Sequence, residues 1–405
     1  MALKEQYQVS GGYRKWSLAL SGIGLLSVIV GYFVYGTGDE EHQTRFWSAL
    51  LQNSVYFLLI VNAAMFFICA TTLAMGGWQL SFRRVSEAIS VAVIPLGLIA
   101  FVILMCLVFG HQHHIYHWLT PEGDRILEGK SGFLNPTFFT IWTVLSIGLW
   151  IILGLKMRRL SQELDREPIK SIESGRSSIF KTTVWASIYI VWFALTVAST
   201  TPWLWLMSID AHWFSTMYSW YTFASTFVAG LALITLFVIY LKNQGYLELV
   251  NEEHLHDLGK FMFAFSIFWT YLWFSQFMLI WYANIPEETV YFKPRVQGAY
   301  SGIFWLTVII NFVAPLLILM RRSSKRNYTT VTFMSVLIIF GHWLDFFQMV
   351  FPGPLTDHVP LGIFDFGIAL GFIGLIMVVT GRQLSKNSMY VKNHPFFKET
   401  IIHHT

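Results

Sequence analysis

A histidine and an aspartate three residues apart are the sharpest chemical feature of this sequence. His342 and Asp345 lie in FGHWLDFFQMV (340–350), and a spacing of three puts both side chains on one face of a helix. Imidazole titrates near neutral pH and a nearby carboxylate tunes it, so the pair could relay protons. Asp365, in the next apolar segment, could share their polar pocket. A buried structural pair that holds two helices together explains the spacing equally well.

Two acidic residues at the starts of other apolar segments, on the opposite predicted membrane side from Asp345, are further candidates for a proton path. Glu87 follows Arg83 and Arg84, where an interfacial ion pair explains it as well as a proton entry point does. Asp257 lies in EEHLHDLGK (252–260), which could gather protons or form a solvated helix start whose dipole favours acids. Either residue could complete a path whose outer part contains His342, Asp345 and Asp365.

Four histidines crowd the sequence HQHHIYHW (111–118), after the third apolar segment. If a helix continues there, His111 and His114 are neighbours on its surface, and so are His113 and His117. A metal site is disfavoured because no carboxylate or cysteine follows at a usual spacing. A haem needs histidines from facing helices at bilayer depth. A proton-buffering or quinone-adjacent surface, with His111 and His114 as candidates, remains open beside a polar helix end that docks on a partner.

The remaining polar candidate is Gln276, which lies among aromatic residues that suit a quinone headgroup, together with His342 and Asp345. Its ordinary alternative is a hydrogen bond between helices, worth about 0.6 kcal/mol. Cys69 and Cys106 are isolated, and the sequence has no cysteine run, mid-span histidine pair or glycine-rich nucleotide motif. We therefore expect no catalytic residue, no metal and no directly bound redox cofactor.

Long apolar segments must position these side chains. The chain is 55% hydrophobic and only 12% charged, whereas soluble domains carry about 25% charged residues. A bilayer core needs about 20 apolar residues per helix, and segments of that length exclude a barrel. The sequence predicts an all-α integral membrane protein with ten transmembrane helices at about 16–36, 46–75, 85–110, 136–157, 179–205, 214–241, 257–283, 298–320, 328–350 and 361–380.

Charge orients the predicted helices. All but five of the 27 Lys and Arg residues fall on one side of them, and the positive-inside rule puts that side in the cytoplasm. Both termini are then cytoplasmic, in one membrane domain that spans residues 1–405. The net charge of +4 is no nucleic-acid signal, because the basic residues flank the spans. The five residues on the opposite side are Arg45, Arg125, Lys130, Lys293 and Arg295.

The seventh segment and its following loop carry a family resemblance. FWTYLWFSQFMLIWYANIPEETVYF (268–292), with HDLGKFMFAFSIFW (256–269) and FGHWLDFFQMVFPG (340–353), resembles the NrfD/PsrC-like integral membrane subunits. The similarity is greatest to the second such subunit of alternative complex III, a quinol:cytochrome c oxidoreductase. It implies two four-helix bundles, at 46–205 and 214–350, with 16–36 and 361–380 as flanking helices.

The resemblance also implies a function. A multi-pass protein of the bacterial inner membrane would pass electrons from quinol to partner subunits and contribute a proton path. The expected partners are a paralogous NrfD-like membrane subunit, a periplasmic iron–sulfur subunit, multihaem cytochrome c subunits and membrane lipid. The outer end of the second segment offers Gln52 and Asn53 but no histidine, which argues against a quinone site in the first bundle. Direct quinone binding by this chain and independent secondary transport are the alternatives.

Overall fold

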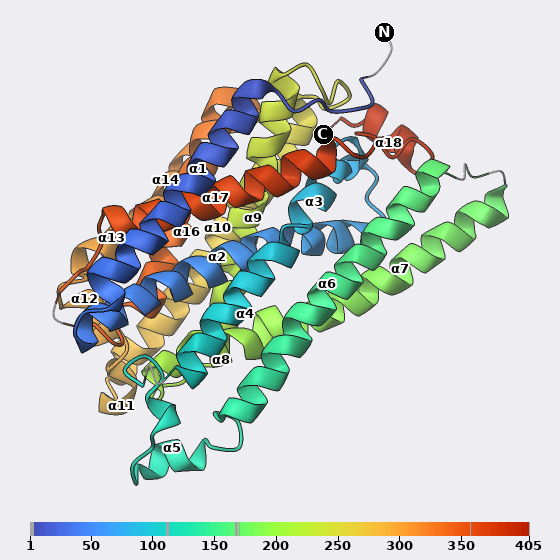
Figure 1. Cartoon of the computed structure of the whole chain (residues 1–405). Helices are drawn as coiled ribbons and strands as arrows, with labels where there is room; N and C mark the ends of the chain where they lie inside the picture. Colours follow the sequence, from blue (N-terminus) through green and yellow to red (C-terminus); the bar gives the residue numbers. More distant parts are fainter. Residues whose placement is uncertain (1–3, 111–112, 167–168, 170, 357, 405) are drawn as a thin grey trace.

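The computed structural model describes residues 4–404 apart from 111–112, 167–168, 170 and 357. Within these described residues the chain is helical without a strand, and ten helices are long and apolar enough to cross a membrane (Figure 1). The prediction of an all-helical chain with ten long apolar helices is confirmed. These are α1 (Gly11–Gly31, continued by a π-helical turn to Gly36), α2 (Glu40–Leu73), α3 with α4 (Arg83–Ser90 and Val93–Phe109), α6 (Pro136–Arg166), α7 with α8 (Ile172–Leu195 and Thr201–Trp205), α9 (Met217–Asn243), α10 (Glu252–Ala283), α13 with α14 (Ser301–Val308 and Ala314–Leu319), α16 (Tyr328–Val350) and α17 (Ile363–Leu384).

Four of these helices begin five to seven residues before the predicted positions, because polar residues cap them. The Ser10 side chain accepts a hydrogen bond from the Tyr13 backbone N–H at the start of α1. The Asp39 side chain accepts a hydrogen bond from the His42 backbone N–H at the start of α2. Asn251 does the same for α10, and Ser171 does so for α7. Capping side chains satisfy backbone donors that a helix start leaves unpaired. The helices therefore extend beyond the apolar segments that hydropathy detects.

Prolines account for three interruptions within the long helices. Pro95, Pro202 and Pro315 each follow a break, because proline lacks the N–H that would bond to the carbonyl four residues earlier. The first break separates α3 from α4. The other two are π-helical turns, at Thr196–Thr200 before α8 and at Ile309–Val313 before α14. Such turns often occur at functional sites.

The long helices pack as two rings of four, with one pair outside. In the first ring α2, α4, α6 and α7 each contact their two neighbours, and in the second α9, α10, α13–α14 and α16 do so. The rings meet where α2 packs on α9 and α16. Outside them α1 and α17 run together, and a Cβ built at Gly24 would lie 2.2 Å from the Gly371 Cα. Only small residues permit so close an approach of two membrane helices.

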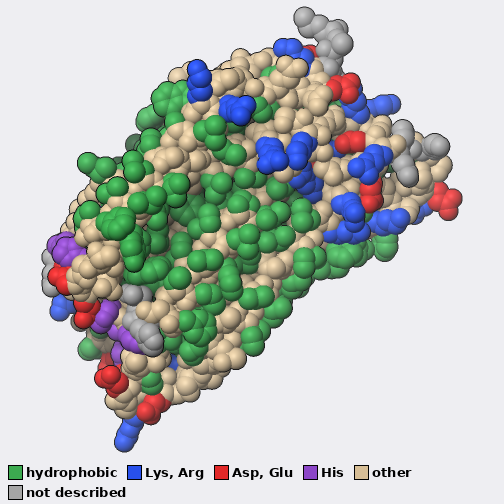
Figure 2. Space-filling model, viewed as in Figure 1, with side chains coloured by type: hydrophobic (Ala, Val, Ile, Leu, Met, Phe, Trp, Pro, Cys, Tyr) green, Lys and Arg blue, Asp and Glu red, His purple; other side chains and the backbone are tan. Residues whose placement is uncertain are grey.

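Charged side chains separate to the two ends of the molecule. Figure 2 shows Lys and Arg gathered at the end where both termini lie, and His with many of the acidic side chains at the opposite end. A broad apolar surface lies between them on this face. The N-terminal segment is joined to the C-terminal segment by a hydrogen bond from the Met389 N–H to the Glu5 carbonyl, at 2.7 Å. This distribution indicates a multi-pass membrane protein.

Candidate functional site

The second ring of helices encloses a carboxylate that is held by neutral donors. Asp345 on α16 is 1% exposed, and it accepts hydrogen bonds from the Tyr221 hydroxyl and the Ser225 hydroxyl of α9. The Trp269 indole N–H of α10 donates to the same carboxylate, at 3.0 Å. A buried charge without a hydrogen-bonded partner would be very costly. Three helices therefore combine to satisfy this one side chain with a phenol, an alcohol and an indole.

His342 is connected to this carboxylate through a serine. Its Nδ1 lies 2.9 Å from the Ser225 Oγ, whose other contact is Asp345 Oδ2, also at 2.9 Å. The direct separation of His342 Nδ1 and Asp345 Oδ2 is 3.8 Å. With a proton on Nδ1 the imidazole donates to the hydroxyl and the hydroxyl donates to the carboxylate. The three side chains thus form a continuous hydrogen-bonded chain across α9 and α16.

A small cavity adjoins Asp345. Its volume is about 20 Å³, roughly the room that one water needs, and Gln276 and Gln348 are among the residues that line it. Both side chains are at least nine-tenths buried. Gln276 Nε2 and Gln348 Oε1 have no hydrogen-bond partner among the described residues. Buried groups left unpaired cost about 1–3 kcal/mol, so this cavity suits a polar guest.

A buried arginine also lines that cavity. Arg295, on the short helix α12 (Phe292–Val296), is 2% exposed and pairs with Asp210 at 3.1 Å. Its Nε also donates to the Gln348 carbonyl at 2.8 Å, and its guanidinium stacks 3.5 Å from the centre of the Tyr291 ring. Burial raises the pKa of Tyr291 to about 12. The phenol therefore stays neutral, and Asp210 provides the charge that compensates the arginine.

The π-helical turn of the eighth span places an amide beside the histidine's helix. Asn311 is fully buried, and neither of its side-chain atoms has a hydrogen-bond partner among the described residues. It approaches α16 at Gly341, where an added Cβ would lie 2.1 Å from Asn311 Oδ1. His342 follows directly in the chain, and its Nε2 is also unpartnered among those residues. Glycine at 341 is thus required for the close approach of this amide.

Two of the other predicted carboxylates lie outside this site and pair with arginines. Asp365 on α17 bonds to Arg45 of α2 at 2.8 Å, among residues that do not line the Asp345 cavity. Glu87 on α3 bonds to Arg83 at 3.0 Å and to Arg84 at 2.7 Å. Their geometry is that of the ion-pair alternative, whereas Asp345 keeps the geometry of a relay. The single pocket envisaged for Asp345 and Asp365 is not formed.

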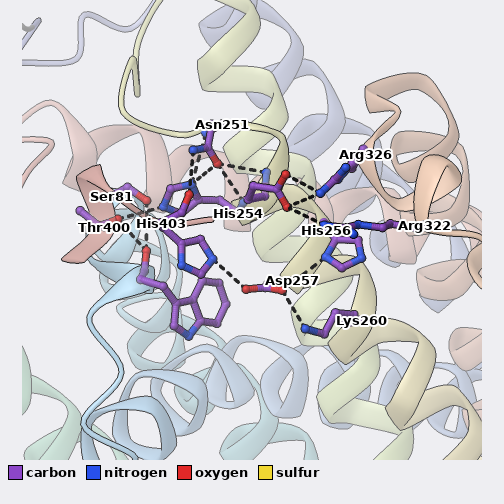
Figure 3. A network of polar contacts seen from close by, with 12 residues as sticks. Ser81, Asn251, His254, His256, Asp257, Lys260, Arg322, Arg326, Thr400 and His403 are labelled. Atoms are coloured by element: carbon purple, nitrogen blue, oxygen red, sulfur yellow. Dashed lines mark hydrogen bonds and ion pairs between the residues drawn. The ribbon is translucent and has the colours of Figure 1, made fainter. Parts of the chain in front are cut away.

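Asp257 lies at the end of the second ring that contacts the C-terminal segment, within a polar network (Figure 3). Its carboxylate contacts His403 Nε2 at 2.8 Å and Lys260 Nζ at 3.1 Å. His254, one turn earlier on α10, contacts Thr400 of the short helix α18 (Phe397–Ile401) at 2.9 Å. The C-terminal segment therefore covers the start of α10. The other half of the same helix carries Trp269 and Gln276. Sequence reasoning missed His403 and Thr400, because about 146 residues separate them from their partners.

The helix before the histidine cluster does not continue through the described part of that cluster. Helix α4 ends at Phe109, and His117 lies in a short 3-10 turn, so His113 and His117 are not neighbours on a helix surface. His114 pairs with Glu40 at 2.6 Å on the surface, and His111 lies outside the described residues. Burial lowers the pKa of His117 below its usual range. Among the described residues no group of three or more His, Cys, Asp or Glu is placed to hold a metal ion.

Comparison with models of known protein families finds no match, and a search of the curated proteins finds no relative. The donors to Asp345 are Tyr221, Ser225 and Trp269, and the sequence did not single them out as site residues. Tyr221 and Ser225 are four residues apart on α9, a spacing that places them on one helix face. That spacing is the one signal that could have found them.

Proposed function

We propose that this protein is a membrane subunit of a quinol-oxidising respiratory complex, has no redox centre of its own, and carries protons through its second ring of helices. The motifs at 268–292 and 340–353 support the family, since they resemble NrfD/PsrC-like subunits. One observation carries the proton role: Asp345 is buried among neutral donors, and Ser225 links it to His342. Ionisable groups at such depth are costly and therefore mark functional sites.

The contacts of Asp345 suit a group that changes its charge. A carboxylate beside an arginine is held in its charged form, whereas hydroxyl and indole groups tolerate either form. A proton on His342 Nδ1 could pass to the Ser225 oxygen while the hydroxyl proton passes to Asp345. Water in the cavity beside Gln276 would then exchange protons with the carboxylate. At the other end of the ring, Asp257 and His403 offer a proton acceptor close to the basic surface.

The complex supplies the electron chemistry in this proposal. Oxidation of one quinol releases two protons and two electrons; the electrons pass to iron–sulfur clusters and c-type haems in partner subunits. Those partners are a paralogous NrfD-like membrane subunit, a periplasmic iron–sulfur subunit and multihaem cytochromes. The Lys- and Arg-rich end faces the cytoplasm of a bacterium, so both termini are inside. The chain crosses the inner membrane ten times, with lipid around it.

The decisive experiment compares proton release by complexes with single substitutions. The complex is purified in mild detergent from native membranes, identified by mass spectrometry and its reduced-minus-oxidised spectrum, and reconstituted in vesicles. We expect Asp345→Asn to lower the number of protons released per quinol while haem and iron–sulfur subunits still co-purify. Ser225→Ala should act in the same direction, since it removes the link to His342. Glu128→Gln, the same loss of charge at an exposed carboxylate of the short helix α5 (Arg125–Gly129), is the matched control.

The two parts of the proposal fail separately in this experiment. An unchanged proton number in Asp345→Asn would refute the proton path while leaving the subunit role intact. A chain that purifies alone and colourless from native membrane would refute the role in a respiratory complex. Independent transport would then take first place, tested by activity of the chain reconstituted by itself.

A second candidate function is direct quinone binding, which the unpaired amide atoms of Gln276 and Gln348 favour. Both face the cavity beside Asp345, where a quinone carbonyl could accept from Gln276 Nε2 and a hydroxyl could donate to Gln348 Oε1. The cavity has room for about one water, so Arg295 or its loop would have to move to admit a headgroup. Photolabelling by a quinone analogue at Gln276, His342 or Asp345 would support this role. Labelling confined to a partner chain would count against it.

A further inference from the structure

A long apolar groove runs between the second ring and the outer pair of helices. Its volume is about 690 Å³, within the range of ligand pockets. Phe57 and Ile60 of α2 form its floor, α9 and α16 form one wall, and α17 forms the other. The groove exists because α16 packs on α9 and α2, whereas α17 packs on α1, α2 and α3. The two walls therefore diverge from α2.

The groove is as long as one leaflet of a bilayer. On α16 it is lined from Thr332 to Trp343, and on α17 from Met377 to Phe366. Each pair is eleven residues apart, which at 1.5 Å per residue corresponds to about 16 Å. The hydrocarbon core of a bilayer is about 30 Å thick, so the groove covers about half of it. Two independent helices thus give the same length.

The two ends of the groove differ in polarity. At mid-depth Trp343 closes it, with its ring 6.1 Å from the Phe340 ring and 5.3 Å from the Phe366 ring. At the membrane surface its lining includes Tyr240 and Asn243, the last residue of α9. Such a shape, apolar inside and polar at the surface, fits a molecule with a hydrocarbon chain and a polar head.

The polar end of the groove lies beside basic side chains. Lys4 Nζ is 5.4 Å from the centre of the Tyr246 ring. Tyr246 follows three residues after Asn243, which lines the groove. Arg14 is exposed and follows Tyr13, whose ring also lines the groove. Basic residues close to a membrane surface attract anionic lipid, at about 1 kcal/mol for each residue. The head of the bound molecule should therefore be negatively charged.

We infer that this groove binds an anionic phospholipid of the leaflet at the basic end of the protein. One acyl chain lies along Val336, Leu370 and the other apolar residues between α16 and α17, and its tip meets Trp343. The headgroup lies at Asn243, within reach of Lys4 and Arg14. A lipid held there would fill the space between the second ring and the α1–α17 pair, and would fix their separation.

Native mass spectrometry of the full chain tests the groove. Delipidated protein is titrated with palmitoyl-oleoyl phosphatidylglycerol, and the fraction that retains lipid is measured. Val336→Trp fills the groove from an exposed position of its wall, so we expect at least a fivefold loss of retained lipid. Val191→Trp is the matched control, because Val191 is an exposed valine of α7 outside the groove. Equal retention by wild type and Val336→Trp would overturn the inference.

A second pair of variants tests the headgroup. Lys4→Gln with Arg14→Gln should bring the preference for phosphatidylglycerol over phosphatidylethanolamine close to one. Arg176→Gln with Lys181→Gln removes two exposed charges at the start of α7, and should leave the preference unchanged. An unchanged preference in the first pair would overturn the anionic assignment. A quinone that co-purifies with wild type and is lost from Val336→Trp would assign the groove to an isoprenoid tail instead.

Discussion

Two buried carboxylates, one in each ring of helices, have opposite kinds of partner, charged in the first ring and neutral in the second. In the span that α3 forms with α4 of the first ring, Glu87 forms ion pairs with Arg83 and Arg84. Arg84 also forms an ion pair with Asp165 of α6. In the second ring Asp345 meets a phenol, an alcohol and an indole. The first arrangement compensates charge with charge. The difference teaches that burial alone does not mark a site of chemistry, because the partners decide whether a carboxylate can change its protonation.

The arginine-bound carboxylates hold elements together. Arg84 also donates to the Ser161 carbonyl at 3.2 Å, so the Glu87 cluster joins α3 to α6. Removing one partner of a buried pair leaves an uncompensated charge, whereas removing both is often nearly neutral. Single and paired substitutions therefore distinguish the two kinds of carboxylate by stability.

The largest effect is expected from Glu87→Gln. This change leaves Arg83 and Arg84 buried with one acid fewer, and should cost about 3–5 kcal/mol of unfolding free energy. Denaturant unfolding in detergent measures the loss. Glu163→Gln changes an exposed carboxyl of α6 and should alter stability by less than about 0.5 kcal/mol. Equal stability of the two variants would mean that the Glu87 cluster is no structural ion pair.

A smaller effect is expected at the join between α2 and α17. Arg45→Met leaves Asp365 buried without its cation, and should cost about 3 kcal/mol. Adding Asp365→Asn removes the charge but keeps an acceptor for the Gly362 N–H, which now bonds to the carboxylate at 2.9 Å. The double variant should regain at least half of the loss in the same unfolding measurement. A double variant less stable than Arg45→Met would contradict the pairing.

Hydropathy predicted the ten helices because lipid-facing and buried segments alike must be apolar over about 20 residues. It missed the capped starts of α1, α2, α7 and α10, whose polar residues lie beyond those segments. A costly ionisable pair within an apolar run could likewise be found from sequence, and His342 and Asp345 were. Their role in proton transfer stays a prediction.

The partners of these groups could not be predicted, because they come from distant parts of the chain. Tyr221 precedes Asp345 by 124 residues, and Arg45 precedes Asp365 by 320. In a chain that is 17% aromatic, one more tyrosine or tryptophan carries no signal. Prolines mark two of the helix irregularities, since Pro202 and Pro315 each follow a π-helical turn.

Asp345→Asn tests the same comparison at the carboxylate that is held by neutral donors. Asparagine keeps an acceptor for Ser225 and Trp269, and among the described residues no arginine pairs with the carboxylate, so no charge would be left behind. We expect a loss of about 1 kcal/mol, within the range of a single altered hydrogen bond. The same variant should lose proton release, whereas Glu87→Gln should lose stability. A cost of 3 kcal/mol or more in Asp345→Asn would place Asp345 among the structural carboxylates.

The smallest expected effect concerns the C-terminal segment, which contacts residues close to the ends of both rings. His394 lies beside Arg83 of the first ring, and burial, helped by that arginine, lowers its pKa to about 3. Its Nδ1 accepts from the Phe396 N–H at 3.2 Å, which a protonated ring cannot do. Because the unfolded value is 6.5, the stabilisation is complete above about pH 6.5. It is lost as the pH falls towards 3.

Hydrogen exchange of residues 390–401 measures this dependence. Between pH 7 and pH 5, after correction for intrinsic rates, we expect protection of these amides to fall several-fold in the wild type. His394→Phe keeps a buried ring without a titrating group, and should make protection independent of pH. His404→Gln removes an exposed histidine from the same segment, and should behave as the wild type. Equal pH dependence in His394→Phe would show that the attachment to the second ring, through His403 and Asp257, controls the segment instead.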